Sequence, residues 1–530
     1  MVDCYDYIVI GSGFGGSVSA LRLAEKGYSV CLIERGKRWH QEDFAKSNWL
    51  LWKWLWMPNL FCTGIQSLTF LKNALVLSSS GVGGGSLVYA AVLLEPPRPF
   101  FDDPQWRDLQ DDWQKTLAPF YDTARRMLGV TPNPKLGKSD ELLLEYAREI
   151  GRDHYFKATD VGIYFGDPDK FNPDPYFDGD GPPRKGCEHN GHCMVGCRHG
   201  GKNSLDRNYL YLAEKLGVDI IAEREVTNIQ SLTEGGYRVE SIRSTGYIRS
   251  RQKPLTAKGI ILAAGALGTN KLLLRCKQNG SLPRLSEQLG KTVRTNSEVL
   301  VGATASDDSS NFSKGIAITS SLFVTDNTHI EPVRYPEKSD AMSFIATIMT
   351  DGAGRFTRPI KFLWNCLRHP LLFLKTLNPI HWAKRSIIFL VMQNYDNQLD
   401  LSLRRKWYWP FKKRLSSHWP SSSIPTFIPE ANHAARSIAK KINGYACSSI
   451  TEVALNMPLS AHILGGCVIG KDSQHGVVDA TCKVFGYEDM YVVDGAAVPA
   501  NLGVNPSLTI TAIAEYAMSH IPEKEKDEKS

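Results

Sequence analysis

The stretch Asp6-Tyr-Ile-Val-Ile10, followed directly by Gly11-Ser12-Gly13-Phe14-Gly15-Gly16, decides the fold. A short apolar run before a Gly-x-Gly-x-x-Gly turn is typical of a strand buried on both faces of a parallel sheet. Residues 17–26 then have the pattern of a helix, and 28–33 the pattern of a second strand. The order strand, glycine turn, helix, strand predicts a Rossmann-like unit that binds a dinucleotide.

Each part of the turn has a physical task. We expect Gly11 to permit the tight turn, Gly13 to let the backbone approach a pyrophosphate, and Gly16 to let the helix pack on the strand. The helix N-terminus offers unpaired N–H groups and the positive end of a dipole to phosphate. Glu34 ends the second strand, at a spacing from Gly11 that suits a carboxylate bound to ribose hydroxyls. FAD and NAD both remain open on this motif, since both use the same turn.

A second glycine-rich segment, Gly81-Val-Gly83-Gly84-Gly85-Ser86, distinguishes between these cofactors. Backbone without side chains can lie flat against a planar ligand and donate N–H groups to phosphate or ring oxygens. The alternative is a flexible surface linker, but the apolar run 87–94 that follows indicates burial. The segment therefore favours a flavin.

The composition of the whole chain is that of an ordinary globular protein. Its 530 residues are 42% hydrophobic and 22% charged, which excludes a disordered, collagen-like or disulfide-stapled protein. The net charge of +7 is too dilute over this length to predict nucleic-acid binding. Prolines and charges interrupt residues 361–392, so no membrane span is predicted there. The N-terminus lacks the pattern of a secretory signal, and we expect a cytoplasmic protein.

Several segments in order resemble the glucose-methanol-choline (GMC) family of flavin oxidoreductases, and within it the sterol-oxidising branch that binds FAD non-covalently. They are the two glycine-rich segments, ILAAGALGT at 261–269, HILGGCVIG at 462–470 and YVVDGAAVPANLGVNPSLTITA at 491–512. The resemblance covers nearly the whole chain. It implies an α/β fold in which a discontinuous Rossmann-like FAD-binding domain carries an α+β substrate-binding domain.

The resemblance also implies a division of the chain. We expect the FAD-binding domain in residues 1–130, 200–300 and 451–520, a connecting segment in 131–199, the substrate-binding domain in 301–450 and a charged tail in 521–530. The cofactor-binding residues it implies are Gly11, Gly13, Phe14, Gly15 and Gly16 for the pyrophosphate, Glu34 for the ribose, Gly81, Gly83, Gly84, Gly85 and Ser86 for the flavin side, Val226 for the adenine, and Asp494, Gly495, Asn505 and Pro506 for the ribityl chain and the ring.

The chemistry requires a base, because oxidation of an alcohol removes the hydroxyl proton while hydride passes to flavin N5. The resemblance places the family's catalytic histidine at His462 and its second catalytic polar residue at Asn505. An amide can hydrogen-bond the substrate oxygen without titrating. Asn505 is alternatively the N-cap of a helix predicted over 507–516.

Sterol-oxidising members of the family also use a glutamate to move a ring double bond from Δ5 to Δ4. The aligned position, near Lys384-Arg385-Ser386, holds no carboxylate. Glu331 is the nearest alternative, but it is equally a surface carboxylate paired with Arg334. We therefore predict FAD-dependent oxidation of the 3β-hydroxyl of a sterol to the ketone, with oxygen as electron acceptor, and leave isomerisation open.

Cys187, Cys193 and Cys197 form a cluster with the spacing C-x5-C-x3-C. Three thiolates can hold an iron–sulfur cluster or, with His189 or His192, a zinc ion. The spacing resembles that of GMC sugar dehydrogenases. It implies an alternative function, a dehydrogenase for another secondary alcohol that passes electrons through an iron–sulfur cluster to a carrier. The other interpretation is a set of packed thiols bracing a loop.

Two aromatic-rich segments suggest contact with lipid. Residues 49–57 contain four tryptophans, and residues 404–414 mix arginines and lysines with aromatic side chains. Both patterns suit peripheral contact with a membrane surface, or else a buried lid or an ordinary loop.

Overall fold

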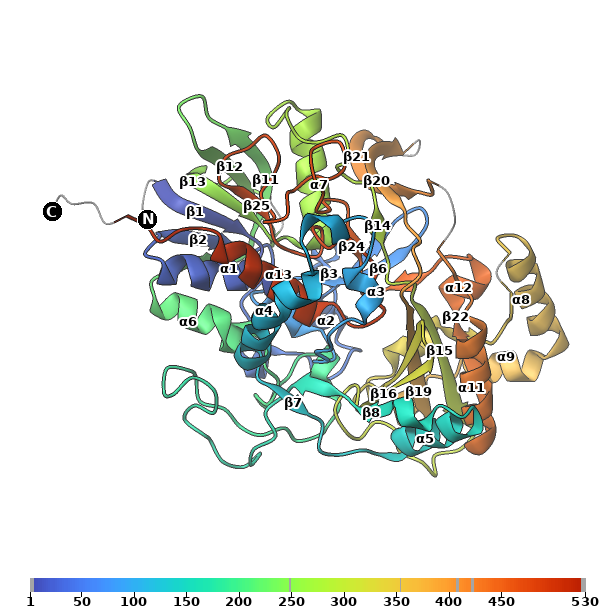
Figure 1. Ribbon diagram of the computed structural model, residues 1–530. Coiled ribbons are helices and arrows are strands. Elements are labelled where there is room, and N and C mark those ends of the chain that lie inside the picture. Colours follow the sequence, from blue (N-terminus) through green and yellow to red (C-terminus); the bar gives the residue numbers. More distant parts are fainter. Residues whose placement is uncertain (1–3, 247–248, 353, 407–408, 421–423, 526–530) are drawn as a thin grey trace.

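Two seven-stranded sheets organise the molecule (Figure 1). The computed structural model describes residues 4–246, 249–352, 354–406, 409–420 and 424–525. The first sheet has the strand order β10-β2-β1-β13-β12-β11, with β25 paired to β13. The second has the order β18-β22-β15-β19-β17-β16-β8.

The first sheet is built from three segments that are far apart in the sequence. Its strands are β1 (Cys4–Ile10), β2 (Val30–Ile33), β10 (Asp219–Ile221), β11 (Arg224–Ser231), β12 (Tyr237–Arg243), β13 (Leu255–Leu262) and β25 (Met490–Val492). β1 lies parallel to both β2 and β13, and β25 lies parallel to β13. Because β1 is central, all but its first residue is buried. This arrangement confirms the predicted α/β class with a discontinuous Rossmann-like unit.

Helices on one side of this sheet fix the start of the chain against its end. They include α1 (Phe14–Glu25), α4 (Trp113–Met127), α6 (Tyr209–Lys215) and α13 (Ser507–Ser519), while α7 (Gly265–Gln278) follows β13. Buried Glu515 of α13 accepts hydrogen bonds from Arg22 Nε at 2.7 Å and from the Tyr209 hydroxyl at 2.6 Å. One carboxylate therefore links three helices from distant parts of the sequence.

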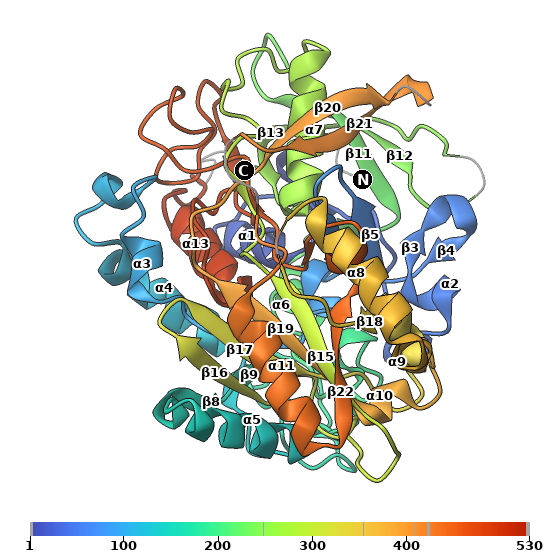
Figure 2. The same ribbon diagram turned by 90° about the vertical axis from the view of Figure 1, so that its right-hand side faces the viewer.

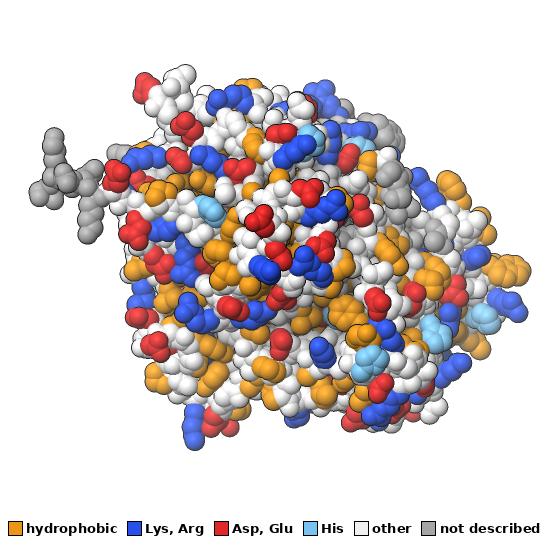
Figure 3. Space-filling model, viewed as in Figure 1, with side chains coloured by type: hydrophobic (Ala, Val, Ile, Leu, Met, Phe, Trp, Pro, Cys, Tyr) orange, Lys and Arg blue, Asp and Glu red, His pale blue; other side chains and the backbone are white. Residues whose placement is uncertain are grey.

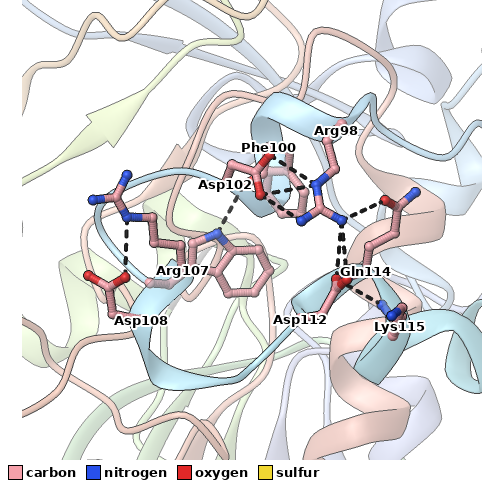
Figure 4. Close-up of polar contacts among 9 residues, drawn as sticks. Arg98, Phe100, Asp102, Arg107, Asp108, Asp112, Gln114 and Lys115 are labelled. Atoms are coloured by element: carbon pink, nitrogen blue, oxygen red, sulfur yellow. Dashed lines mark hydrogen bonds and ion pairs between the residues drawn. The ribbon is translucent and has the colours of Figure 1, made fainter.

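The entry to α4 shows how local side chains begin a helix (Figure 4). Asp112 is the N-cap, and its Oδ1 accepts hydrogen bonds from the backbone N–H groups of Gln114 at 3.0 Å and Lys115 at 3.3 Å. Arg98, at the start of the short helix α3 (Arg98–Phe101), donates to Asp102, Asp112 and Gln114. These pairs are exposed and screened by water, so they orient the connection more than they stabilise it.

The second sheet is antiparallel and has two different faces. Its strands are β8 (Phe156–Ala158), β15 (Val299–Ala305), β16 (Ser320–Thr325), β17 (Thr328–Val333), β18 (Ala346–Ile348), β19 (Ser386–Gln393) and β22 (Gly444–Ser449). Helices α5 (Lys138–Glu149) and α11 (Pro429–Lys441) cover one face (Figure 2). Along β19, Ile387 and Phe389 belong to that helix-covered cluster, whereas Ile388 and Leu390 point to the other side. That other side faces the first sheet and forms a wall of the site.

Smaller elements surround the two sheets. They are α2 (Leu51–Trp54), β3 (Trp56–Met57), β4 (Cys62–Thr63), β5 (Gln66–Phe70), β6 (Leu75–Ser79), β7 (Val130–Pro132), β9 (Asp160–Gly162), β14 (Val293–Arg294), η8 (Asp340–Ile345), α8 (Thr357–Arg368), α9 (Pro370–Thr376), α10 (Trp382–Arg385), β20 (Asp400–Lys406), β21 (Trp409–His418), α12 (Ile450–Ala454), β23 (Leu459–Ser460) and β24 (Leu464–Gly465). None of the helices in the described ranges is long and apolar enough to cross a bilayer. The division into domains by residue range stays a prediction.

The structure shows only part of each predicted aromatic-rich segment as exposed or describes only part of it. In 49–57, Trp54 and Trp56 are buried, while Trp49 and Trp52 are exposed. In 404–414, Trp407 and Tyr408 lie outside the described residues. β20 and β21, on either side of them, pair as a hairpin.

Candidate active site

A cavity of about 950 Å³ lies between the two sheets and is lined by both. The first sheet contributes the turn between β1 and α1 and the start of α7. The second sheet contributes an apolar wall of residues Leu300, Val333, Ile388 and Leu390, and Ile318, just before β16, extends it. A volume of this size is in the upper part of the range for cofactor and ligand sites. The cavity thus has a glycine-rich end and a hydrocarbon-lined end.

The two glycine-rich segments meet at the first end. A Cβ on Gly84 would lie 2.5 Å from the Cα of Gly13, so the two backbones are in contact there. A Cβ on Gly11 would lie 2.3 Å from Ala263 O, one on Gly15 1.9 Å from Val493 O, and one on Gly16 1.9 Å from Gly11 O. A Cβ on Gly13 would meet only Ala263 O, at an ordinary contact distance of 3.9 Å, and Gly13 lines the cavity.

These glycines fit the pyrophosphate of a dinucleotide. α1 begins directly after Gly13, so its unpaired N–H groups are directed at the cavity. α13 begins at Ser507, and Asn505, Pro506 and Ser507 also line the cavity. Two helix N-termini therefore offer positive dipole ends to one ligand.

Most of the predicted cofactor-binding residues line this cavity. Those that do are Gly11, Gly13, Phe14, Gly15, Glu34, Gly84, Gly85, Val226, Asp494, Gly495, Asn505 and Pro506. The other four predicted residues lie behind the lining: Gly16, Gly81, Gly83 and Ser86. The Ser86 hydroxyl donates to Gly83 O at 2.6 Å and accepts from Leu205 N at 2.9 Å, so it holds the loop in shape.

Glu34 is buried at the cavity wall with its carboxylate already bonded. Oε2 accepts from Ser12 N and Oγ at 3.2 and 2.7 Å, and Oε1 accepts from Gly36 N at 2.7 Å and Gly81 N at 3.2 Å. The carboxylate therefore joins the two glycine-rich segments. Its contact with a ribose stays a prediction.

His462 and Glu298 form a pair in the cavity lining, in which Glu298 is buried and the His462 side chain is 14% exposed. His462 Nδ1 contacts Glu298 Oε1, and Glu298 Oε2 accepts from Ala461 N at 2.6 Å. Burial opposes a charged imidazole, but the Glu298 carboxylate more than offsets this, so the pKa of His462 is raised above its ordinary value. The imidazole is thereby fixed in orientation and made a stronger base.

Asn505 and Glu331 lie beside this pair. Asn505 Nδ2 donates to Glu331 Oε2 at 3.1 Å, and no hydrogen-bond partner of Asn505 Oδ1 or Glu331 Oε1 is found among the described residues. Glu331 is fully buried, one hydrogen bond behind the lining. Burial raises its pKa to about 7.

Two alternatives from the sequence are wrong here. Glu331 is not a surface carboxylate paired with Arg334, because the guanidinium of Arg334 lies 3.8 Å from Asp140 and donates to Ser139 and Thr319. Asn505 is not the N-cap of α13. That position is Pro506, which has no side-chain cap, and the Asn505 side chain reaches Glu331 instead.

Residues 295–298 hold the site together, and the sequence did not single them out. Asn296 Oδ1 accepts from Leu502 N and Gly503 N, and Asn296 Nδ2 donates to Val504 O at 2.9 Å. Asn296 and Ser297 have φ of 58° and 49°, a left-handed conformation that places Glu298 against Ala461 and His462. A single short segment therefore clamps both the chain before Asn505 and the chain around His462. The available signal was the polar run Thr295-Asn-Ser-Glu298 directly before an apolar strand.

Asp494 completes the polar lining near the glycines. Its Oδ2 accepts from the Thr269 hydroxyl at 2.5 Å and its Oδ1 accepts from Ala496 N at 2.8 Å. Burial raises the pKa of Asp494 to about 6. These bonds fix the loop Asp494–Gly495 at the cavity wall.

The structure gives no support to the predicted metal site at the cysteine cluster, which stays a prediction. In the described ranges, no three His, Cys, Asp or Glu side chains are arranged to hold a metal ion, and residues 187–199 lie within those ranges. Burial raises the pKa of Cys187 to about 12, which disfavours the thiolate that a metal requires. His189 stacks on Phe165, and His192 Nε2 lies 3.3 Å from Lys46 O. This arrangement favours the alternative in which packed thiols brace a loop.

Comparisons with known proteins agree with this geometry. Models of the GMC oxidoreductase family match residues 183–289 and 425–514, and a model of the NAD(P)-binding Rossmann-like domain matches residues 9–39. A cholesterol oxidase of Acinetobacter baumannii is 44% identical over 98% of this chain and 95% of its own length. A cholesterol oxidase of Mycobacterium tuberculosis is 45% identical over 98% of this chain and 91% of its own.

Solved structures share the fold. Pyridoxine 4-oxidase from Mesorbium loti superimposes with a TM-score of 0.62 at 14% identity, covering 98% of this chain and 99% of that one. An FAD-dependent oxidoreductase from Chaetomium thermophilum gives a TM-score of 0.59 at 15% identity, covering 97% and 98%. The glycine cradle, the two helix N-termini and the near full-length identity agree: this chain belongs to the GMC oxidoreductase family and is an FAD-dependent oxidoreductase that acts on CH–OH groups.

Proposed function

We propose that this protein oxidises the 3β-hydroxyl of a sterol to the ketone, with FAD as cofactor and oxygen as final electron acceptor. The observation that carries the proposal is the composition of one cavity. A glycine cradle lines one end, an apolar wall lines the other, and His462 lies in the lining with both. The two relatives named cholesterol oxidase, at 44% and 45% identity, support the choice of a sterol.

The apolar wall suits a sterol because the skeleton is hydrocarbon with one hydroxyl. Leu300, Ile388 and Leu390 project from neighbouring strands of the second sheet into this wall. Burial of hydrocarbon against such a wall contributes roughly 25 cal/mol per Å². A polar alcohol would gain little from it.

His462 is the proposed general base and Asn505 the second polar residue of the reaction. Bound FAD supplies the hydride acceptor, at N5 of its ring. Glu298 holds Nδ1, so Nε2 is the nitrogen left to take the hydroxyl proton. The negative Glu298 stabilises the imidazolium that results. Asn505 gives one Nδ2 hydrogen to Glu331, so its second Nδ2 hydrogen is left to donate to the substrate oxygen.

The test is a flavin spectrum of the purified protein, followed by anaerobic addition of cholesterol. We expect the oxidised flavin bands to bleach with cholesterol and to return with air as hydrogen peroxide forms. The 3α-epimer serves as a matched control, since it has the same skeleton with the hydroxyl displaced. Flavin that stays oxidised with cholesterol would rule out the sterol assignment, and reduction without peroxide would rule out oxygen as the acceptor.

Isomerisation of the double bond is a second candidate step, favoured by Glu331, which lies directly behind the lining residue Asn505 and would have to turn past it to reach the substrate. A carboxyl group that carries a proton between two carbons works best with a pKa near the operating pH, and Glu331 has a pKa of about 7. We expect wild-type protein to release the conjugated ketone, seen by its ultraviolet absorbance. Glu331→Gln should release the unconjugated ketone; a conjugated product from this variant would remove Glu331 from the step.

We further propose that the protein takes its substrate from a membrane as a peripheral protein, because a sterol is sparingly soluble in water. The exposed tryptophans Trp49 and Trp52 are compatible with such contact.

A further inference from the structure

Helices α8 and α9 carry an apolar face that no part of the described chain covers. Nine of the twenty-four large hydrophobic residues that are exposed in the described ranges fall within residues 356–380. They are Phe356, Ile360, Leu363, Trp364, Leu367, Leu371, Leu374, Leu377 and Ile380. Leu367 and Leu371 are each 75% exposed. Large contiguous apolar patches of this kind mark interaction sites.

The exposed face is not the face that folding uses. α8 buries Phe362, which packs with Ile348 and Val453 in a small cluster that also takes in Phe373 of α9. Buried Arg358, on the same helix, donates to Thr350 O and Thr426 O. The inner face alone therefore anchors the helix pair to the protein.

The outer face has the spacing of an amphipathic helix. Ile360, Leu363, Trp364 and Leu367 stand at positions i, i+3, i+4 and i+7 of α8. Pro370 starts α9, which continues the exposed apolar surface through Leu371 and Leu374. α8 has twelve residues and α9 seven, and neither can span a bilayer, so the pair can only lie along a surface.

The charge around this face has one sign. Residues 352–395 contain seven Lys and Arg and no Asp or Glu. Four of these cations, Arg355, Lys361, Arg368 and Lys375, are exposed, and none of the four is ion-paired within the described chain. Figure 3 shows orange hydrophobic side chains beside blue Lys and Arg at the right-hand edge of the molecule, over α8 and α9.

The nearest acidic groups are already engaged. Asp308 lies 2.9 Å from His381 and 3.5 Å from Arg385, next to α10, and Asp351 pairs with Arg436 at 2.8 Å. A hydrophobic face bordered by unpaired cations complements a layer of anionic headgroups over hydrocarbon.

The helix pair is also connected to the cavity. η8 contributes Met342 to the cavity lining and leads directly into β18, on which α8 and α9 pack. In η8, Phe344 is 64% exposed and meets the ring of Trp49 edge to face at 5.6 Å. Exposed aromatics thus continue from the helix pair toward the segment 49–52.

We propose that α8 and α9 form a monotopic docking surface that lies in the interface of an anionic phospholipid bilayer. The exposed leucines, Ile360 and Trp364 enter the acyl boundary, and Lys361, Arg368 and Lys375 meet the phosphates. This inference specifies the surface behind the peripheral contact proposed above, but it does not depend on the identity of the substrate.

The test is co-sedimentation of FAD-loaded protein with vesicles of phosphatidylcholine alone or mixed in equal molar parts with phosphatidylglycerol. We expect binding to the mixed vesicles and at least about tenfold weaker binding of the double variant Trp364→Ser, Leu367→Ser, from lost hydrocarbon burial. The matched control is Phe171→Ser, Leu216→Ser, which removes two exposed hydrophobics from elsewhere on the surface and should bind as wild type.

A charge variant tests the second half of the proposal. Lys361→Gln, Arg368→Gln, Lys375→Gln should weaken binding to the mixed vesicles by about a hundredfold, since each cation near an anionic surface contributes about 1 kcal/mol, and leave binding to phosphatidylcholine unchanged. All variants should keep the flavin spectrum and the rate with detergent-dispersed cholesterol.

Three outcomes would overturn the docking surface. They are wild-type protein that ignores both vesicles, apolar variants that bind as tightly as wild type, and a wild-type dimer that Trp364→Ser, Leu367→Ser converts to monomer, which would assign the face to a second copy of the chain. If cholesterol fails to reduce the flavin while vesicle binding behaves as expected, the proposed function fails and the surface stands.

Discussion

Two clusters of chemically active side chains in this protein differ in how far apart their members lie in the sequence. Cys187, Cys193 and Cys197 lie within eleven residues of one another, yet they are not arranged to hold a metal. Glu298, Glu331, His462 and Asn505 are spread over more than two hundred residues, yet they meet beside one cavity. Closeness in sequence did not make the site; the packing of one sheet against the other did.

The difference lies in what holds each cluster. The thiols sit in a Gly-rich loop, where Lys202 donates to Cys193 O at 2.6 Å and to Leu87 O at 3.0 Å and so binds backbone and not sulfur. The segment 295–298 contains Glu298 and hydrogen-bonds to the residues next to His462 and Asn505. Glu298 accepts from Ala461 N, and Asn296 donates to Val504 O. Substitutions in each cluster should therefore have very unequal effects.

The largest effect is expected at His462. His462→Ala removes the proposed base, and we expect turnover with cholesterol to fall by about 10²- to 10⁴-fold while FAD stays bound. The measurement is peroxide formation with the flavin spectrum as a check on folding. His475→Ala is the matched control, since that histidine is exposed and its side chain pairs with Asp472 alone among the described residues. Equal rates for the two variants would remove His462 from the chemistry.

Glu298→Gln should have the next largest effect, about a hundredfold on kcat. The base works only when deprotonated, so activity is lost as pH falls below the pKa of His462. The Glu298 carboxylate raises that pKa, and its removal leaves burial opposed only by the weaker attraction of the Glu331 carboxylate. We therefore expect the acid limb of the rate profile to move to lower pH in the variant. A reduced rate with an unmoved acid limb would show that Glu298 only supports the structure.

The glycine-rich end of the cavity could be predicted from the sequence far better than the carboxylates around His462. The turn Gly11–Gly16 is local: strand, turn and helix are consecutive, so spacing alone specifies the geometry. Glu331 looked like a surface residue because its neighbours in sequence include Arg334, and only the pairing of β17 with β19 shows that it is buried. Glu298 carried no motif at all. Its role comes from a contact with residues 163 and 164 positions later, which no local pattern encodes.

Glu331→Gln should change how stability depends on pH. Burial raises the pKa of Glu331 above its unfolded value, so the folded state binds the proton more tightly, and this contribution to stability is lost as pH rises from about 4.5 toward about 7. The loss is about 3 kcal/mol at most. Glutamine keeps an acceptor for Asn505 without the charge. We expect the variant to gain unfolding free energy relative to wild type between pH of about 5 and about 8; parallel curves would place the raised pKa elsewhere.

The smallest effect is expected at the cysteine cluster. A large effect there would contradict the difference between this cluster and the one around His462. The variant Cys187→Ser, Cys193→Ala, Cys197→Ser removes every thiol that a metal would need. Because the structure assigns these thiols to packing, we expect the peroxide rate and the FAD content to stay within about twofold of wild type, with no loss of iron or zinc on metal analysis. Buried Cys193→Ala should cost about 1 kcal/mol of unfolding free energy through a small cavity. Cys276→Ala, another buried thiol in α7 and remote in sequence, is the control and should cost a similar amount. Iron that copurifies with wild type and disappears from the triple variant, together with a change of electron acceptor, would reverse the assignment and restore the relay that the spacing of the three cysteines first predicted.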